Sequence, residues 1–383
     1  MKKILFISPR NPFSGRYSGD VIRAKKFIYF LSKDNYVKVI SPDVENSKKK
    51  ESKLNYEGFK SPNFLIKIFY IIISIIKLRP FQLGYFYSPQ IESYIKSNYQ
   101  NYDLIFFQSY RTAQYLPKSL KNKSIMDMSD LVSKNYEQTY KRLFFLNPIK
   151  IIYYIESLLL KKYETFCFEN FKKIFLFSKK EINSVNKKYR KKISQYSFGI
   201  EHIEKKYKFN TKNYKIIFIG NIKYAPNKRA CYQFANSILP KILKIYPSIE
   251  FHIIGEISKI DSFFLKRKPN VKILNKVNNL KPHLNNIVCG LANLDIATGI
   301  QTKLLTYMSY GIPSVCSKKV AENFDAIKES KIHFYRNNEE MIKIILKLKK
   351  DKNFSLSASK RALKIIKKFK WNKILPVLNE VLK

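Results

Sequence analysis

The chain repeats one pattern in its two halves: a short apolar run, a loop that contains glycine, and then a helix. In the first half the run is residues 3–8, the loop is 9–20 and the predicted helix is 21–31. The second half restarts with a run at 214–220, and its helix is predicted over about 228–245. Strand, loop, helix and strand in this order form the repeating unit of a helix-covered parallel sheet. The pattern therefore predicts an α/β fold of two doubly wound, Rossmann-like domains that face each other across a cleft.

Further short apolar runs extend this alternation, and each is expected to be an interior strand. The predicted strands are 37–41, 103–108, 124–126 and 174–178 in the first half, and 249–255, 271–274, 286–289 and 314–317 in the second. The link between the halves is the polar, Lys-rich segment 201–213. We therefore expect a first domain at 1–205 and a second domain at 206–383, whose last helix can pack back on the first.

The most informative single stretch is residues 298–317, which predicts a glycine loop, a short helix and a buried strand. Gly311 and Pro313 follow the helix, as is typical of a helix end. Unpaired backbone N–H groups at the start of this helix, with Lys303 as a mobile cation in its first turn, would suit a diphosphate. The same residues also fit an ordinary loop–helix–strand step of an α/β sheet, and the local pattern leaves both interpretations open.

The strong positive charge restricts the classes of partner. The 383-residue chain has 73 Lys and Arg against 28 Asp and Glu, which gives a formal net charge of +45. These cations are spread over the whole chain and accompany no zinc-finger, basic-zipper or RNA-recognition motif. Most of them are expected to form a solvated surface. Nucleic acid is therefore not an expected partner, whereas an anionic membrane surface stays open as one.

Cysteine and histidine usage argues against a metal centre. The four Cys and four His are dispersed, without the spacing of a metal site or of a disulfide framework. We therefore expect no metal, and a reducing, cytoplasmic compartment. The apolar start at residues 1–7 is cut by Pro9 and Arg10, which predicts a first strand rather than a signal peptide.

Residues 64–78 depart from the pattern of a water-soluble domain because they are almost wholly apolar. The run is shorter than the roughly 20 residues of a membrane span, and Lys67 and Lys77 interrupt it. One interpretation is a helix buried against a sheet. The alternative is a helix that lies on an anionic membrane surface, flanked by its lysines.

Three motifs stand out along the chain: Gly-Asp-Val-Ile-Arg at 19–23, Gly-Asn-Ile-Lys-Tyr-Ala-Pro-Asn at 220–227, and Gly-Ile-Gln-Thr-Lys at 299–303 followed by Gly-Ile-Pro at 311–313. They resemble motifs of the GT-B glycosyltransferases, most closely the retaining enzymes of glycosyltransferase family 4 of the bacterial exopolysaccharide type. The first motif is similar to the opening of the first domain of these enzymes and the second to the opening of their second domain, and the third is the more specific. The resemblance spans nearly the full chain.

This resemblance implies a metal-independent glycosyltransferase of the hexosyltransferase type that uses no cofactor. Its second domain would hold a nucleotide-diphosphate sugar as donor substrate, and its first domain a glycan or lipid-linked acceptor. The sugar would be transferred with retention, in surface polysaccharide assembly, by a cytoplasmic protein that can be peripheral on the inner membrane face. The residues expected to bind the donor are Gly220, Asn221, Asn227, Gly299, Ile300, Gln301, Lys303 and Thr306.

Four residues of the first half are candidates for the catalytic side. Gly15 and Gly19 lie in the first loop, where small residues let the backbone approach a reacting sugar; a flexible loop with an ion-paired Arg16 is the alternative. Arg111 follows a predicted strand and is expected to reach the acceptor or a phosphate, or to form a surface ion pair. Asp127 also follows a strand, either as a carboxylate in the cleft or as a helix N-cap.

The chain departs from the family pattern at two positions. Relatives usually have two carboxylates, eight positions apart, where this chain has Thr298 and Thr306. The second carboxylate commonly binds the ribose hydroxyls of the nucleotide, and a Thr hydroxyl would bind them more weakly. A catalytically inactive, glycosyltransferase-like binding protein is therefore an alternative function, and a charge-driven binder of anionic polymers is a third.

Overall fold

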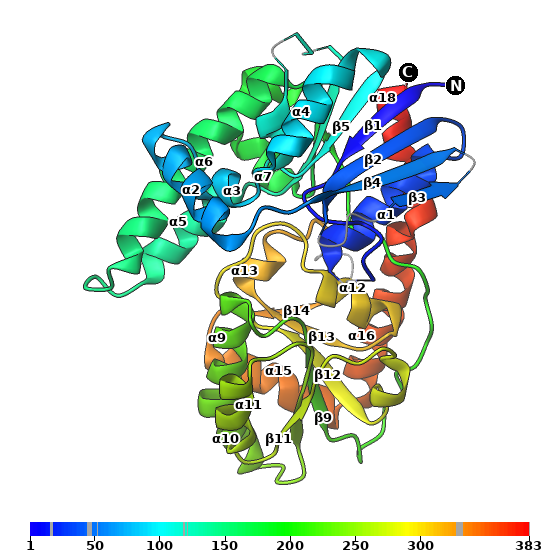
Figure 1. The fold of residues 1–383 in the computed structure, drawn as a ribbon. Helices are drawn as coiled ribbons and strands as arrows, with labels where there is room; N and C mark the ends of the chain where they lie inside the picture. Colours follow the sequence, from blue (N-terminus) through cyan, green and yellow to red (C-terminus); the bar gives the residue numbers. More distant parts are fainter. Residues whose placement is uncertain are drawn as a thin grey trace. The chain divides into compact units, whose positions relative to one another are not determined.

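The computed structural model describes residues 1–15, 18–43, 48–51, 53–117, 119–120, 122–326 and 332–382. The chain divides into two compact units, each built around its own parallel sheet (Figure 1). Unit 1 comprises Met1–Ser197 together with Ile374–Lys383, and unit 2 comprises Phe198–Lys373. The end of the chain is therefore part of the same compact unit as its start.

Within its described residues, unit 1 contains an eight-stranded sheet in the order β3-β4-β2-β1-β5-β6-β7-β8. The strands are β1 (Lys3–Ile7), β2 (Tyr36–Asp43), β3 (Lys48–Glu51), β4 (Leu54–Lys60), β5 (Leu104–Gln108), β6 (Ser124–Ser129), β7 (Lys173–Leu176) and β8 (Ile193–Gln195). All neighbours pair in parallel except β3, which is antiparallel to β4. The central strands β1 and β5 are buried on both faces, which explains their unbroken apolar sequences.

The helices of unit 1 connect these strands. They are α1 (Gly19–Leu31), α2 (Phe64–Ile76), α3 (Phe81–Tyr85), α4 (Pro89–Asn98), η1 (Tyr99–Asn101), η2 (Thr112–Tyr115), α5 (Val132–Arg142), α6 (Ile149–Asn170), α7 (Lys179–Ser184) and α8 (Lys187–Arg190). The chain ends through α17 (Trp371–Ile374), η6 (Leu375–Leu378) and α18 (Asn379–Leu382). In Figure 1, α18 lies beside the start of β1, where the Lys2 side chain donates to the backbone oxygen of Leu382.

Two helical pairs of unit 1 carry exposed apolar side chains. The segment 64–78 forms α2 as a helix, but the expectation that it is buried against a sheet is wrong. Phe64 is 71% exposed and Leu65 is 75% exposed, and Phe69, Ile72 and Ile76 are also exposed. The helix packs through its other side on α3, where the Tyr70 backbone approaches so closely that a Cβ on Gly84 would lie 2.3 Å from its oxygen. No helix of the described residues has the length and apolarity needed to cross a membrane.

The second pair is α5 and α6, which pack along each other. The turn between them exposes Phe144, Phe145 and Leu146. Two buried carboxylates of α6 hold the starts of neighbouring helices: Glu164 accepts from the Ser133 backbone N–H of α5 at 2.9 Å, and Glu156 accepts from the Phe81 backbone N–H of α3 at 2.8 Å. The α2–α3 pair and the α5–α6 pair are therefore attached to each other within unit 1.

The described part of unit 2 contains a six-stranded parallel sheet in the order β11-β10-β9-β12-β13-β14. Its strands are β9 (Lys215–Ile219), β10 (Glu250–Ile254), β11 (Val271–Leu274), β12 (Ile287–Ala292), β13 (Ser314–Ser317) and β14 (His333–Tyr335). Renumbered from one, this order is 3-2-1-4-5-6, the strand order of dinucleotide-binding doubly wound folds. The predicted α/β class and the doubly wound architecture are confirmed.

Helices cover both sides of this sheet, with α9 and α10 on one side and α12 and α16 on the other (Figure 1). They are α9 (Ala225–Gln233), η3 (Phe234–Ile238), α10 (Leu239–Leu243), α11 (Lys259–Lys266), η4 (Lys281–His283), α12 (Thr302–Ser309), α13 (Lys318–Ala321), α15 (Asn338–Lys350), α16 (Lys352–Ile365) and η5 (Ile366–Phe369). The single helix predicted over about 228–245 is instead α9, a π-helical segment η3 and α10. Pro240 cannot donate a backbone hydrogen bond, and the helix changes its bonding pattern in the turn before it.

Candidate functional site

The predicted donor residues of unit 2 gather at the carboxyl ends of two neighbouring strands. These strands, β9 and β12, pair in parallel although β10 and β11 lie between them in the sequence. Ligands of doubly wound folds bind outside such a point, where the strand order reverses. Gly220 directly follows β9, and residues 299–301 lead into α12 after β12. The two predicted motifs therefore meet at one end of one sheet.

The centre of this cluster is Lys303, whose side chain is buried in the first turn of α12. Its Nζ donates to Oδ1 of Asn227 at 2.8 Å and lies 3.6 Å from the centre of the Phe218 ring. A Cβ on Gly220 would lie 3.1 Å from Asn227 Nδ2 and 3.4 Å from Lys303 Nζ, so glycine leaves room for this contact. The expectation of a mobile cation is wrong, because Asn227 and Phe218 enclose the amino group.

Burial lowers the pKa of Lys303 to about 7. Among the groups that the structure describes, no carboxylate offsets this shift. An anion placed beside the amino group would stabilise its charged form and raise the pKa again. The protonation state of Lys303 is therefore expected to depend on whether an anionic ligand lies beside it.

The other predicted donor residues lie mainly in the two loops that lead to Asn227 and to Lys303. Asn227 Nδ2 donates to the backbone oxygen of Asn221 at 2.8 Å, which closes the loop after β9. Gly299 has a φ of 57°, a left-handed conformation that favours glycine, and Ile300 next to it is half-buried. Gln301 is the residue before α12, and its Nε2 donates to the backbone oxygen of Thr298 at 3.2 Å.

Thr306 lies one turn further along α12 than Lys303 and is half-buried. Its Oγ1 donates to the backbone oxygen of Thr302 at 3.1 Å. This bond is made within the helix itself, and such a hydroxyl can rotate to meet a ligand.

Two glycines of unit 2 shape this end of the sheet, and the sequence analysis missed them both. Gly255 has a φ of 147°, and a Cβ there would lie 1.9 Å from the backbone oxygen of Gly220. Gly290 in β12 lies under the ring of Tyr307, where a Cβ would meet ring atoms at 2.6 Å. The Tyr307 hydroxyl donates to the backbone oxygen of Leu291 at 3.0 Å and anchors α12 on the sheet. An isolated glycine within an apolar run was the signal available for both.

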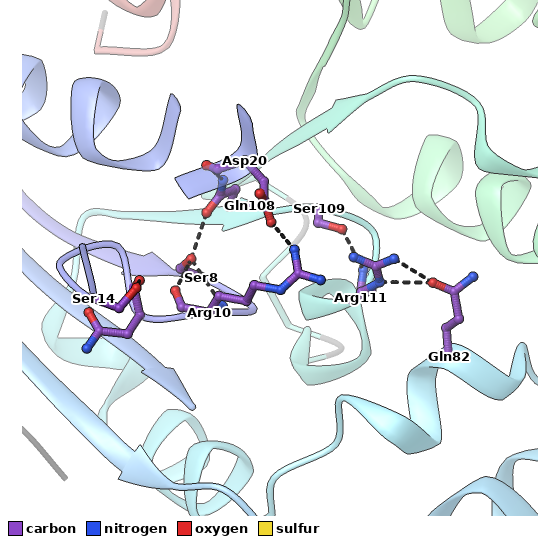
Figure 2. Close-up of polar contacts among 9 residues, drawn as sticks. Ser8, Arg10, Ser14, Asp20, Gln82, Gln108, Ser109 and Arg111 are labelled. Atoms are coloured by element: carbon purple, nitrogen blue, oxygen red, sulfur yellow. Dashed lines mark hydrogen bonds and ion pairs between the residues drawn. The ribbon is translucent and has the colours of Figure 1, made fainter. Parts of the chain in front are cut away.

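In unit 1 the strand order reverses between β1 and β5, as it does between β9 and β12 in unit 2. Side chains at the carboxyl ends of β1 and β5 are joined by hydrogen bonds (Figure 2). Ser8 Oγ donates to Oε1 of Gln108 at 2.7 Å, and Gln108 Nε2 donates to the backbone oxygen of Asp20 at 2.7 Å. The Asp20 carboxylate pairs with Arg10 from the loop after β1. Burial opposes ionisation of Asp20, but the charges of Arg10 and Arg23 and the hydrogen bonds from Arg10 and Ser18 together outweigh burial and lower the pKa of Asp20.

Arg111 lies beyond the end of β5, as predicted, and it contacts α3 and the residue after it. Its Nε and Nη2 donate to Oε1 of Gln82 at 3.0 and 2.6 Å, and its guanidinium carbon lies 4.4 Å from the centre of the Phe86 ring. The Arg10 guanidinium carbon lies 5.6 Å from the centre of the same ring. Arg10, Gln82 and Phe86 were not predicted, because the pairing of β1 with β5 brings Arg10 to Arg111 and the packing of α3 brings Gln82 and Phe86.

Asp127 belongs to β6, so the N-cap interpretation is wrong. Its carboxylate is fully buried and accepts from Arg23 Nε at 2.6 Å, from Ser129 Oγ at 3.1 Å and from the Tyr196 hydroxyl. Burial opposes the charge of Arg23, but the interactions with Asp127, Tyr196 and Asp20 together outweigh burial and raise the pKa of Arg23. The assignment of Asp127 as catalytic stays a prediction, and its burial argues for a role in holding unit 1 together.

The first loop of unit 1 is described only in part. Gly15 is exposed with a φ of 67°, and Gly19 is the first residue of α1. Arg16 and Tyr17 lie outside the described residues, so the two interpretations of Arg16 stay predictions. Among the described residues, no group of three His, Cys, Asp or Glu side chains is placed to hold a metal ion.

Comparison with known proteins agrees with this geometry. Residues 213–351, most of unit 2, match the family model described as Glycosyl transferases group 1. No curated protein matches the sequence.

Three solved structures resemble the chain over its whole length. Sucrose-phosphate synthase from Thermosynechococcus elongatus has a TM-score of 0.74 at 10% identity, covering 100% of this chain and 98% of that one. WaaG, a glycosyltransferase involved in lipopolysaccharide biosynthesis, has a TM-score of 0.66 at 10% identity over 99% of both chains. Anabaena HepE in complex with UDP and glucose has a TM-score of 0.66 at 12% identity, over 100% of this chain and 99% of that one. The protein therefore has the GT-B fold of these solved structures, and residues 213–351 of its second unit are similar to the group 1 glycosyltransferases.

Proposed function

We propose that this protein transfers a sugar, a hexose, from a nucleotide-diphosphate donor to a glycan or lipid-linked acceptor. Transfer proceeds with retention at the anomeric carbon, in surface polysaccharide assembly. The observation that carries the proposal is the buried Lys303, which has no carboxylate partner among the described residues and lies in the first turn of α12. HepE, whose solved structure is in complex with UDP and glucose, shares the fold and makes a nucleotide sugar the first donor to test.

In this proposal the donor diphosphate binds at the carboxyl ends of β9 and β12. Backbone N–H groups at the start of α12, preceded by Gly299 and Gln301, face the phosphates, and Lys303 supplies a positive charge. As the bond to the sugar breaks, negative charge grows on the leaving diphosphate. Groups that are already fixed in place stabilise that charge without reorganising, so this site needs no metal for the step.

A thermal-shift screen against nucleotides and nucleotide sugars tests the donor site. A ligand that binds the folded protein raises its melting temperature by mass action, so one base and one sugar should give the largest shift. Lys303→Ala should abolish that shift. The matched control is Lys223→Ala, because Lys223 is exposed, is paired with Glu256 and lies in the other donor motif at 220–227. A panel without any shift would contradict the proposal.

The alternative is a protein that binds a nucleotide sugar without transferring it. Thr298 and Thr306 favour this alternative, because neither can present the charged acceptor that relatives usually have at these positions. Release of nucleoside diphosphate from the donor that the screen identifies distinguishes the two functions. Binding with no release in the presence of membrane extract or glycan acceptors would favour the inactive protein.

We further propose that unit 1 attaches the protein to the cytoplasmic face of an anionic membrane. The exposed apolar side chains of α2 and of the turn between α5 and α6 support this, because so many large apolar groups are costly to leave in water. Lys67 within α2 and Lys77 at its end can meet anionic headgroups while the apolar side chains enter the lipid.

A further inference from the structure

We propose that Arg10 and Arg111 together bind a phosphate group carried by the acceptor. This inference rests on the proposed transfer function and names the chemical class of the acceptor. The two arginines come from the loops after β1 and β5, which are neighbours in the sheet of unit 1. They therefore flank the point where the strand order reverses, the usual ligand position in a doubly wound unit.

The two guanidinium groups converge on one aromatic ring. The guanidinium carbons of Arg10 and Arg111 lie 5.6 and 4.4 Å from the centre of the Phe86 ring. Figure 2 shows both side chains extending toward the same region, with Ser109 beside them. Ser109 has a φ of 73°, so the chain takes an unusual left-handed turn where β5 ends.

The positive charges at this point exceed the negative ones. Arg10 pairs with the Asp20 carboxylate. Arg111 donates two hydrogen bonds to the neutral amide oxygen of Gln82, and no ion pair of the described residues includes it. Gln82 accepts from two of the five N–H groups of Arg111 and the neighbouring Tyr110 side chain also contacts the guanidinium, so N–H groups without a charged partner are left for a ligand. A phosphate fits this arrangement, because its negative charge would balance that of Arg111 and its oxygens can accept two hydrogen bonds from one guanidinium group.

The surroundings of the two arginines favour a phosphate attached to a lipid. Gln82 belongs to α3 and Phe86 follows it directly, and α3 packs against α2 through Gly84. The outward side chains of α2 are apolar and exposed. A phosphate bound by Arg10 and Arg111 would thus lie beside Gln82 and Phe86, next to the helical pair that presents an apolar surface. A soluble sugar phosphate has the same charged group but gains nothing from that surface.

Calorimetric titration of the full chain with dodecyl phosphate, below its micelle concentration, tests this inference. Arg10→Gln and Arg111→Gln should each weaken binding about tenfold or more, because each removes a charged hydrogen-bond donor. Gln82→Glu should weaken it similarly, because the new carboxylate would pair with Arg111 and compete with the phosphate. Arg267→Gln is the matched control, since Arg267 also stacks on a phenylalanine, at 4.0 Å from the ring centre of Phe263 in unit 2.

Two further ligands show which part of dodecyl phosphate the protein recognises. Dodecyl maltoside has the same alkyl chain without a phosphate and should bind far more weakly, whereas equal binding would overturn the inference. Glucose 6-phosphate tests whether a soluble sugar phosphate binds at the same site. Binding as tight as that of dodecyl phosphate, with the same loss in the variants, would support the phosphate site and assign a sugar phosphate as acceptor. Unchanged dodecyl phosphate binding in Arg10→Gln and Gln82→Glu would overturn the inference, even if Arg111→Gln failed to fold.

Failure of the phosphate-binding inference can be distinguished from failure of the proposed transfer function. The thermal shift with nucleotide sugars depends on Lys303 in unit 2 and should persist in the Arg10 and Arg111 variants. If that shift persists and phosphate binding is unaffected by the substitutions, only the present inference fails. If no nucleotide sugar binds at all, the donor proposal fails, while the phosphate titration still reports on Arg10 and Arg111.

Discussion

Arg23 and Asp127 form a buried ion pair in unit 1, with Nε of Arg23 lying 2.6 Å from Oδ2 of Asp127. The pair joins α1 to β6, and the two residues are 104 positions apart in the chain. Ser129 and Tyr196 donate to the other carboxylate oxygen. Both carboxylate oxygens of Asp127 therefore have hydrogen-bond partners inside the protein. Arg23 is the arginine of the Gly-Asp-x-x-Arg motif, so this arginine has a structural role in the present protein.

Replacing Asp127 by Asn should destabilise unit 1 strongly. The substitution leaves the buried Arg23 charge without its partner, a change that typically costs about 3–5 kcal/mol. Urea unfolding measures the change in the free energy of unfolding. Glu137→Gln is the control, because Glu137 pairs with Lys141 on the surface and should change stability by less than about 1 kcal/mol. Full stability with loss of transfer would instead make Asp127 catalytic.

Donor binding should be accompanied by proton uptake at Lys303. The pKa of this group is about 7 in the free protein, so at pH 8 its amino group is mostly neutral. A diphosphate beside it favours the charged form and raises the pKa, so binding draws a proton from the buffer. Calorimetry at pH 8 in buffers of different ionisation enthalpy should show uptake of up to about one proton, and less uptake at pH 6.

The control for proton uptake is Lys303→Met, which should bind the donor more weakly and take up no proton. If uptake is the same in Lys303→Met, the proton goes elsewhere and Lys303 does not face the diphosphate.

Restoring a carboxylate at position 306 should strengthen nucleotide binding. Thr306 lies in α12 after Lys303, and its hydroxyl now bonds to its own helix at Thr302. A Glu can accept from both ribose hydroxyls, and bonds to a charged acceptor contribute roughly 1.5–3 kcal/mol, on the order of tenfold to hundredfold in affinity. Titration of Thr306→Glu with the best nucleotide of the thermal screen measures this, with Thr306→Gln as the uncharged control. Equal or weaker binding of the Glu variant would mean that the ribose lies elsewhere.

Attachment to lipid should depend on the exposed end of α2. Sedimentation with anionic vesicles should be strong, weak with neutral vesicles, and reduced at high salt. Phe64→Glu combined with Leu65→Glu should reduce it further, because two charges would enter the apolar contact. Ile260→Glu is a matched control, since Ile260 is 70% exposed on α11 of unit 2. Protein that stays in the supernatant with every vesicle would contradict the proposal.

Much of the fold could be predicted because short apolar runs between glycine loops specify interior strands. The strand predicted at 314–317 is β13, and that at 271–274 is β11, each with the predicted bounds. Gly311 has a φ of 69°, the left-handed conformation predicted for the end of α12. These features depend on neighbours within a few residues, which a sequence displays directly.

Two of the predictions that failed concern what covers a side chain. Apolar content suggested that residues 64–78 are buried, but the helix α2 exposes one side and packs on α3 through the other. The position of Lys303 suggested a mobile cation, but Phe218 of β9 and Asn227 of α9 enclose its amino group. In each case the deciding neighbour comes from another element, and its approach depends on how elements pack.

The sequence by itself determined the alternation of strand and helix, the class of fold and the motifs that resemble glycosyltransferases, because these follow from local spacing and backbone preference. Only the tertiary structure decided which charged groups meet. Lys303 meets Asn227 across 76 positions, and Arg10 and Arg111 converge on Phe86 from two loops. Parallel strands bring distant segments to one end of a sheet, so the electrostatics of the candidate sites arise from strand order and helix packing rather than from any single stretch of sequence.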